Sequence, residues 1–286
     1  MATPHCYRTE HSETKTSNSI YGSFEAARRS RKIHVQPVLQ KIMQYVDANR
    51  AQFVDNLAEA VKIKSITTEI KYKQEVDKMT KFAEKWLLKL HIDYECFNIG
   101  YYKVDGKRIK LPPIILASLD SSPRKKTVCV YLHLDVLKPD TSKWKTDPWT
   151  LHKEEANFYG CGVACGKGPL MSWFHVIEAF RKCQLELPVN LRFIIESMHH
   201  GHSLGLEDFI ISKTQDFFGA VDYVVMCDSE WLGEKYPCVI YGTVDEDDNI
   251  LINGFHDLVD HVTPDEELMY EHIRDFDPDE IRYGYN

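Results

Sequence analysis

The chain has 286 residues, of which 43% are apolar and 12% aromatic, so it can bury a sizeable core and is not a wholly disordered protein. Its formal charge of −8 argues against a general nucleic-acid-binding protein. The charge is unevenly spread, because residues 1–35 carry +3, residues 36–243 carry +1 and residues 244–286 carry −12. We therefore expect a basic flexible arm at 1–35, a nearly neutral folded domain at 36–243 and an acidic tail at 244–286.

Nothing in the sequence resembles a membrane or secretory segment. The first 30 residues contain no apolar signal core, and no run approaches the roughly 18 apolar residues of a transmembrane helix. The eight cysteines are scattered through a chain of ordinary size, which is typical of reduced thiols in an intracellular protein. These features predict a cytoplasmic protein that binds neither membranes nor nucleic acid.

Two helical segments come first in the folded domain. Apolar residues recur at helical spacing over residues 37–63, which predicts one long or broken helix. The same spacing over residues 74–90 predicts a second helix.

Strands and helices then alternate. Apolar, β-branched runs predict buried strands at residues 127–136, 190–198 and 222–227, with a further strand candidate at 238–241. Helices are predicted over residues 169–183, which has Pro169 in its first turn, and over residues 204–212. This alternation predicts an α/β fold with a doubly wound, mostly parallel sheet.

Potential metal ligands follow the predicted strands. In open α/β sheets, functional groups gather at the carboxyl ends of strands. His133 and Asp135 end the first strand, His199 and His200 follow the second, and Asp228 follows the third. An imidazole with a nearby carboxylate can be a metal ligand with its orienting partner. The alternative is a structural His–Asp pair, a solvated histidine turn and an unremarkable aspartate.

A glycine-rich loop at residues 160–169 opens the predicted helix at 169–183. Its sequence, GCGVACGKGP, could approach an anion through backbone amides. It lacks the GxxxxGK[ST] pattern, because Lys167 is followed by Gly168 and Pro169, so we do not predict nucleotide binding.

Several segments together resemble one enzyme family. The runs VYLHLDV, FYGCGVACGKGP, LPVNLRFIIESMHHGHSLGLEDFI and FFGAVDYVVMCDSEWLGEKYPCVIYGT are similar to the cytosolic non-specific dipeptidase and carnosinase branch of the di-zinc metallopeptidases, over residues 36–243. The resemblance implies a zinc-peptidase-like catalytic domain, whose active members hold two metal ions about 3.5–4 Å apart around a shared water. It implies that His133 is a metal ligand, that Asp135 orients it and that Asp228 is a later ligand.

The sequence departs from the family pattern where the chemistry is most demanding. Cys165 stands at the position of the Asp that bridges both metals, His199 at the general base and His200 at the next metal ligand. One thiolate sulfur cannot bridge as two carboxylate oxygens do, and a neutral imidazole removes charge that balances two dications. After residue 243 the match passes directly to the acidic segment, so the chain is expected to lack most of the family's lid domain and the C-terminal half.

Three functional hypotheses remain open. The leading one is a catalytically inactive relative with a structural or binding role, in which Asp135 and His199 are vestigial catalytic positions. The second is a hydrolase with a non-standard or single-zinc site, in which zinc or manganese binds the degenerate ligand set His133, Cys165, His200 and Asp228. The third, an incomplete form of an active hydrolase, conflicts with the replacements at 165 and 199.

An inactive relative is expected to work through a protein partner. A truncated sheet would expose apolar surface that a partner covers. The basic arm at 1–35 is a candidate for binding an acidic filament surface such as a microtubule, within a larger assembly. The alternative for this arm is a disordered leader.

Overall fold

The computed structural model describes residues 37–104, 106–119, 122–155 and 157–227, together with two short paired strands, β10 (Thr243–Val244) and β11 (Ile250–Leu251). The chain divides into two units, Met1–His34 and Val35–Asn286, and only the second contains described residues. The predicted arm at 1–35, the strand candidate at 238–241 and the predicted ligand Asp228 therefore lie outside the described residues.

The central sheet has five described strands in the order β1-β4-β8-β5-β9. Strands β8, β5 and β9 pair in parallel, whereas β4 is antiparallel to both β1 and β8. Four of the five described strands thus run in the same direction, and the predicted mostly parallel α/β sheet is confirmed. The strands are β1 (Asp93–Phe97), β4 (Ile114–Leu119), β5 (Thr127–His133), β8 (Asn190–Glu196) and β9 (Tyr223–Met226).

The three strands predicted from the sequence correspond to β5, β8 and β9, although β5 ends at His133 rather than at residue 136. Burial is confirmed for β5 and β8 but not for β9, whose residues are exposed or half-buried. Strands β1 and β4 were not predicted. Two small antiparallel hairpins were also not predicted. They are β2 (Tyr101–Val104) with β3 (Lys107–Lys110), and β6 (His152–Glu154) with β7 (Asn157–Tyr159).

The helices largely follow the predicted ranges. The first is broken, as the sequence allowed, into α2 (Pro37–Ala48) and α3 (Arg50–Val61). The break lies at Asn49, whose side-chain amide donates to the Tyr45 carbonyl at 2.8 Å and so competes with the helical hydrogen bonds. The others are α4 (Lys73–Lys89), α5 (Lys167–Lys182) and the short α6 (Leu206–Ser212).

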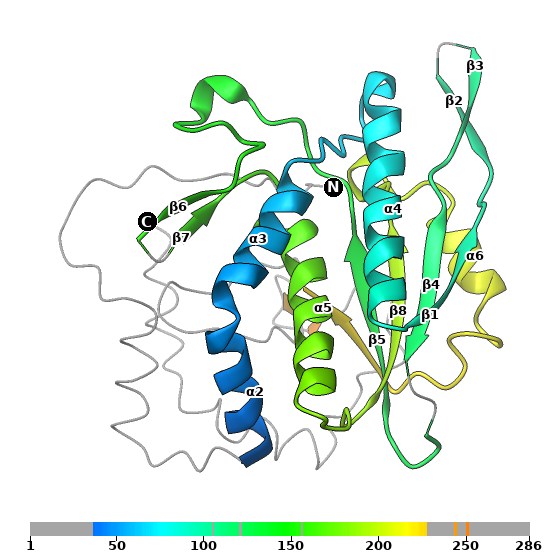
Figure 1. Cartoon of the computed structure of the whole chain (residues 1–286). Coiled ribbons are helices and arrows are strands. Elements are labelled where there is room, and N and C mark those ends of the chain that lie inside the picture. Colours follow the sequence, from blue (N-terminus) through cyan, green and yellow to red (C-terminus); the bar gives the residue numbers. More distant parts are fainter. Residues whose placement is uncertain are drawn as a thin grey trace. The chain divides into compact units, whose positions relative to one another are not determined.

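The helices cover both faces of the sheet, which makes it doubly wound. Helices α3, α4 and α5 lie on one face and α6 on the other (Figure 1). The larger core cluster joins Met79 and Leu87 of α4, Phe174 of α5 and Phe193 of β8, all of them buried. Burial of this apolar surface holds the helices against the sheet, at about 25 cal/mol per Å².

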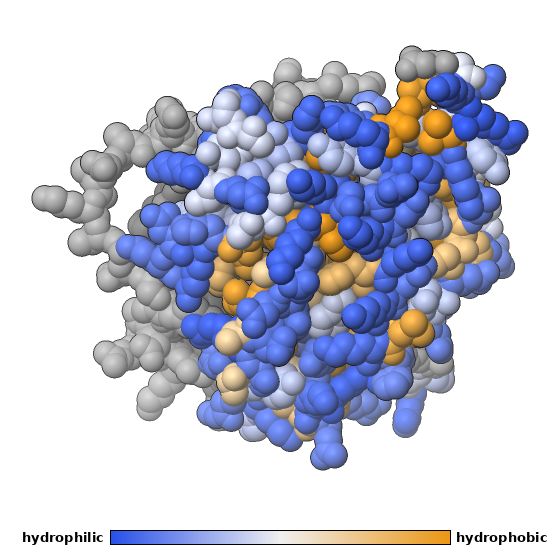
Figure 2. Space-filling model, turned by 45° about the horizontal axis from the view of Figure 1, so that its top comes forward, coloured by the Kyte–Doolittle hydropathy of each residue, from blue (hydrophilic) through white to orange (hydrophobic). Residues whose placement is uncertain are grey.

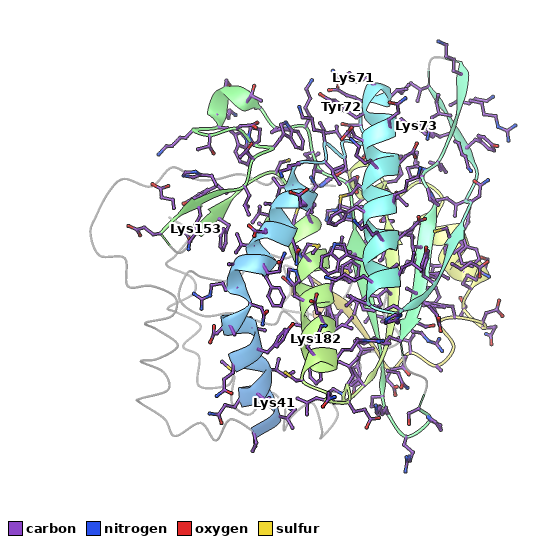
Figure 3. All side chains as sticks on the ribbon, in the orientation of Figure 1. Lys41, Lys71, Tyr72, Lys73, Lys153 and Lys182 are labelled. Atoms are coloured by element: carbon purple, nitrogen blue, oxygen red, sulfur yellow. The ribbon has the colours of Figure 1, made fainter. Side chains whose placement is uncertain are left out.

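A polar contact joins helix α2 to the end of α5. Figure 3 shows Lys41 on α2, beside the end of α5 that carries Lys182. The Lys41 ammonium donates to the Cys183 carbonyl at 2.7 Å. A cation at a helix C-terminus compensates the partial negative charge of the last carbonyls, so this contact stabilises the end of α5.

The face drawn in Figure 2 is mainly hydrophilic, and its hydrophobic residues appear in several separate patches between hydrophilic side chains. Among the described residues, no helix combines the length and apolar character that crossing a bilayer requires.

Candidate functional site

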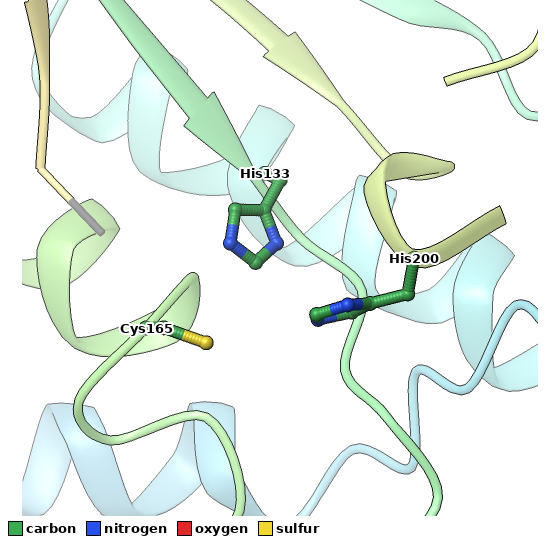
Figure 4. Close-up of side chains that lie close together, drawn as sticks. All are labelled: His133, Cys165 and His200. Carbon is green, nitrogen blue, oxygen red and sulfur yellow. The ribbon is translucent and has the colours of Figure 1, made fainter. Parts of the chain in front are cut away.

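Three potential metal ligands converge at the carboxyl ends of β5 and β8. His133 is the last residue of β5, His200 lies in the 3-10 turn His199–Gly201 that follows β8, and Cys165 belongs to the loop before α5. One donor atom from each side chain lies within 4.8 Å of the other two. Figure 4 shows the three side chains directed toward a common space. The strand-end rule therefore located the histidines, and the resemblance located Cys165.

His133 is held with one ring nitrogen directed at Asp135. Its Nδ1 lies 3.0 Å from the Asp135 carbonyl oxygen and 3.5 Å from the carboxylate oxygen Oδ1. Both oxygens accept hydrogen bonds, so Nδ1 carries the proton and Nε2 presents its lone pair. The Nε2 atoms of His133 and His200 are both shielded from solvent. A histidine that binds a metal through Nε2 requires the tautomer with its proton on Nδ1, which is the tautomer of His133.

Asp135 is a fully buried carboxylate that organises the site. It accepts hydrogen bonds from the Thr67 hydroxyl at 2.7 Å and from the backbone amides of His199 at 3.2 Å and His200 at 2.9 Å. Burial alone would raise the pKa of Asp135, but hydrogen bonds from His133 and Thr67 outweigh burial and lower it. Asp135 therefore carries a negative charge and touches both sides of the site.

His199 faces a second hydrogen-bonded group. Its ring stacks on His133 with centroids 4.3 Å apart, and its Nδ1 lies 3.0 Å from the Tyr131 hydroxyl. Tyr131 donates its proton to the Glu196 carboxylate, which also accepts from the Ser203 hydroxyl at 2.7 Å. The tyrosine oxygen is then an acceptor for the proton on Nδ1 of His199. Nδ1 of His199 is therefore engaged by this hydroxyl and is not the nitrogen that could act as a base or ligand.

Tyr131 and Glu196 were not predicted as site residues from the sequence. Glu196 is buried, and burial raises its pKa despite the hydrogen bonds from Tyr131 and Ser203. A glutamate within the apolar run at 190–198 is the signal that could have identified it, because a buried carboxyl requires partners.

Close packing positions the loop that carries Cys165. Gly166 has φ +76°, and a Cβ there would lie 2.9 Å from Cε1 of His133. Glycine therefore allows the loop to approach the histidine. Lys167 is fully buried and donates to the carbonyls of Val61 at 3.3 Å and Ile63 at 2.6 Å, which anchors the loop to the end of α3. Burial lowers the pKa of Lys167 to about 8.

The donor set fits one metal ion better than two. Two imidazoles and one thiol are ligands that suit a tetrahedral zinc ion. Cys165 offers a single sulfur at the position where the resemblance places a bridging carboxylate, and nothing in the three converging side chains replaces its second oxygen. The fourth predicted ligand, Asp228, lies outside the described residues.

The family assignment rests on the sequence as well as the fold. The sequence pattern of peptidase family M20/M25/M40 matches residues 129–276, a range that includes the converging residues. The chain belongs to this peptidase family.

Metallodipeptidases are among its relatives. Beta-Ala-His dipeptidase of Mus musculus is 32% identical over 289 residues, covering 86% of this chain and 58% of that protein. Cys-Gly metallodipeptidase dug1 of Schizosaccharomyces pombe is 36% identical over 206 residues, covering 71% and 43%. The crystal structure of human carnosine dipeptidase 1 has a TM-score of 0.68 at 30% identity, covering 86% of this chain and 61% of that one. The chain thus spans roughly half the length of the relatives it matches.

Proposed function

We propose that this chain is a catalytically inactive member of the M20 family with a structural or binding role. The observation that carries the proposal is the donor set His133, Cys165 and His200, which holds one sulfur where the resemblance expects a bridging carboxylate. Two-metal hydrolysis places two dications around one water, and anionic ligands are needed to hold them. Two neutral imidazoles and one thiolate supply too little negative charge for that arrangement.

The surroundings of His199 support the same proposal. A general base must take a proton from water and deliver it to the leaving amine. Nδ1 of His199 is hydrogen-bonded to the Tyr131 hydroxyl, and its ring stacks on His133. An imidazole also differs in length and charge from the glutamate that the resemblance expects at this position. Asp135 remains, but its contacts to Thr67 and to two backbone amides make it an orienting residue.

Convergence of the three donors favours a second candidate function, a hydrolase that works with a single zinc ion. In such an enzyme three protein ligands leave one position of the metal open for substrate. Zinc would then supply Lewis-acid chemistry at this site, with His133, Cys165 and His200 holding it. The two candidates differ in one measurable property, which is turnover.

Dipeptide hydrolysis separates the candidates. The purified full chain is incubated with zinc or manganese and with β-alanyl-histidine or cysteinyl-glycine, the dipeptides named for its relatives. We expect the wild type and His133→Ala to release no more free amino acid than the metal alone. Metal-dependent release by the wild type that His133→Ala abolishes would establish the hydrolase and reject the inactive relative.

A protein partner remains part of the proposal. Two side chains of β9 support it, because Val224 and Met226 are 48% and 62% exposed. The filament surface predicted for residues 1–35 stays a prediction, since that arm lies outside the described residues. Deleting 1–35 should abolish co-sedimentation with microtubules, and binding that is insensitive to both the deletion and salt would reject this role.

A further inference from the structure

We propose that His133, Cys165 and His200 bind a single zinc ion with a structural role. The inference rests on the proposed function, because it assigns a non-catalytic ligand to the same site. The metal joins three segments that are separate in the sequence: the end of β5, the loop before α5 and the turn after β8.

The distances require only a small closure around the ion. Zinc binds sulfur at about 2.3 Å and imidazole nitrogen at about 2.0–2.1 Å, which places neighbouring ligand atoms about 3.5 Å apart in a tetrahedron. The donor atoms of the three side chains lie within 4.8 Å of one another. A contraction of about 1 Å therefore forms the shell, and rotations of side chains that already face one space can supply it (Figure 4).

Both histidines are oriented before the metal arrives. Nδ1 of His133 is directed at Asp135, so Nε2, which is shielded from solvent, is the nitrogen that would bind zinc. The backbone amide of His200 donates to the same carboxylate, which fixes the turn that carries its ring. A carboxylate behind a histidine ligand fixes its tautomer and raises its basicity. Asp135 thus acts as a positioning residue for two of the three ligands.

Charge decides in favour of one ion. A zinc ion with one thiolate ligand leaves a net charge of about +1, which the buried Asp135 carboxylate beside the ligands offsets. A second dication would raise the local charge by two. Glu196 is engaged elsewhere, because the Tyr131 and Ser203 hydroxyls both donate to one of its oxygens. The structure therefore favours one zinc ion, with one tetrahedral position left to a ligand other than these three side chains.

Metal stoichiometry of the full chain tests the inference. Protein purified from zinc-supplemented cells and dialysed without chelator is analysed for metals by mass spectrometry. We expect about one zinc per chain, and at least a tenfold weaker affinity in Cys165→Ser and His200→Gln, each measured by competition with a chromogenic chelator. The matched controls Cys96→Ser and His152→Gln change exposed residues outside the ligand cluster and should keep the wild-type affinity.

Cobalt substitution identifies the ligands without relying on stability. Co(II) bound to the wild type should give a near-ultraviolet thiolate-to-cobalt band and the intense visible bands of a tetrahedral site. The thiolate band should vanish in Cys165→Ser and persist in Cys96→Ser. Circular dichroism of each variant verifies that it is folded.

The outcomes separate this inference from the proposed function. Zinc content near zero in the wild type, two ions per chain, or a cobalt spectrum unchanged in Cys165→Ser would each overturn the zinc site, whether or not the chain hydrolyses dipeptides. One zinc together with dipeptide hydrolysis would retain the ligands but reject both the inactive relative and the structural role. One zinc without hydrolysis supports both proposals.

Discussion

The backbone amide of His200 donates a hydrogen bond of 2.9 Å to the carboxylate of Asp135, across the gap between the ends of two neighbouring strands. The same carboxylate has an oxygen 3.5 Å from Nδ1 of His133. A single buried anion therefore links two of the three proposed ligands, and its contribution can be measured separately from theirs.

Asp135→Asn should weaken zinc binding without removing a ligand. The amide is nearly isosteric but carries no charge and accepts fewer hydrogen bonds, so we expect a loss in zinc affinity of about 10–100-fold. Asp140→Asn is the matched control, because Asp140 is an exposed residue whose carboxylate accepts hydrogen bonds from Ser142 and pairs with the nearby Lys143, outside the ligand cluster. Equal zinc affinities in the two variants would contradict the positioning role.

Chelation of zinc should lower the thermal stability of the wild type. A metal that binds only the folded state stabilises it by about 2.7 kcal/mol at one hundred times its dissociation constant. We expect a lower melting temperature in chelator for the wild type and Cys96→Ser, but no change for Cys165→Ser. Differential scanning fluorimetry at fixed protein concentration measures this. A chelator effect that survives in Cys165→Ser would place the stabilising metal elsewhere.

Gly166→Ala should disturb the site more than a substitution at an equally strained glycine. A Cβ at Gly166 would lie 2.9 Å from Cε1 of His133 and 3.2 Å from its carbonyl oxygen. Gly106 has nearly the same φ, +74° against +76°, but a Cβ there has no neighbour within 4 Å. Both variants carry a conformational cost of about 1–3 kcal/mol. Only Gly166→Ala should also lose zinc affinity, and unaltered binding in that variant would show that the loop can shift.

Lys167→Met should destabilise the chain although it removes a charge from the interior. Methionine can replace the aliphatic part of the lysine side chain, but it leaves the carbonyls of Val61 and Ile63 without their hydrogen-bond donor. Each buried group left unpaired costs about 1–3 kcal/mol of stability. Lys62→Met removes an exposed lysine that pairs with Glu59, and surface pairs contribute about 0–1 kcal/mol. Urea unfolding at pH 7 compares the two. A similar free energy of unfolding for both variants would mean that the Lys167 contacts add little.

Stability should decline in mild acid because of His175. This ring is buried, stacks on Phe53 with centroids 4.0 Å apart and lies 3.2 Å from the Asn56 amide nitrogen. Burial, helped by the nearby charge of Lys89, lowers the pKa of His175 from 6.5 to about 4. Because the folded-state pKa is the lower one, the unfolded chain binds the proton first, and stability is lost as the pH falls from 6.5 toward 4.

The size of this loss follows from the two pKa values. Between pH 7 and pH 5 the His175 contribution amounts to about 2 kcal/mol. His175→Phe keeps an aromatic ring against Phe53 but cannot titrate, so its free energy of unfolding should change less between these pH values. Parallel pH dependences for the wild type and the variant would show that other groups cause the loss.

Much of the fold follows from local sequence patterns. Strands β5 and β8 contain runs of apolar and β-branched residues, and the helices show helical spacing, so both were predictable. Strand β1 has only exposed and half-buried residues, so its sequence lacks the signal of a buried strand. Strand β4 contains the adjacent β-branched residues Ile114 and Ile115, so the presence of an apolar, β-branched run could have predicted it.

The site was only partly predictable, because part of it depends on strand register. His133 lies opposite Glu196 in the β5–β8 pair, and this pairing is what brings Tyr131 to the Glu196 carboxylate. Register joins residues more than sixty positions apart, and no local pattern encodes it. The strand-end rule could place His133 and His200 at one edge, but could not reveal that Asp135 contacts both.

The parallel pairing of β5 with β8 also fixes when the three donors can meet during folding. His133 ends β5, Cys165 precedes α5 and His200 follows β8, so the cluster exists only after this complete β-α-β crossover has closed. Parallel pairing across a crossover is a non-local contact and forms late relative to helices. Zinc added during refolding should therefore leave the earliest helix formation unchanged and slow unfolding instead, which stopped-flow circular dichroism can measure.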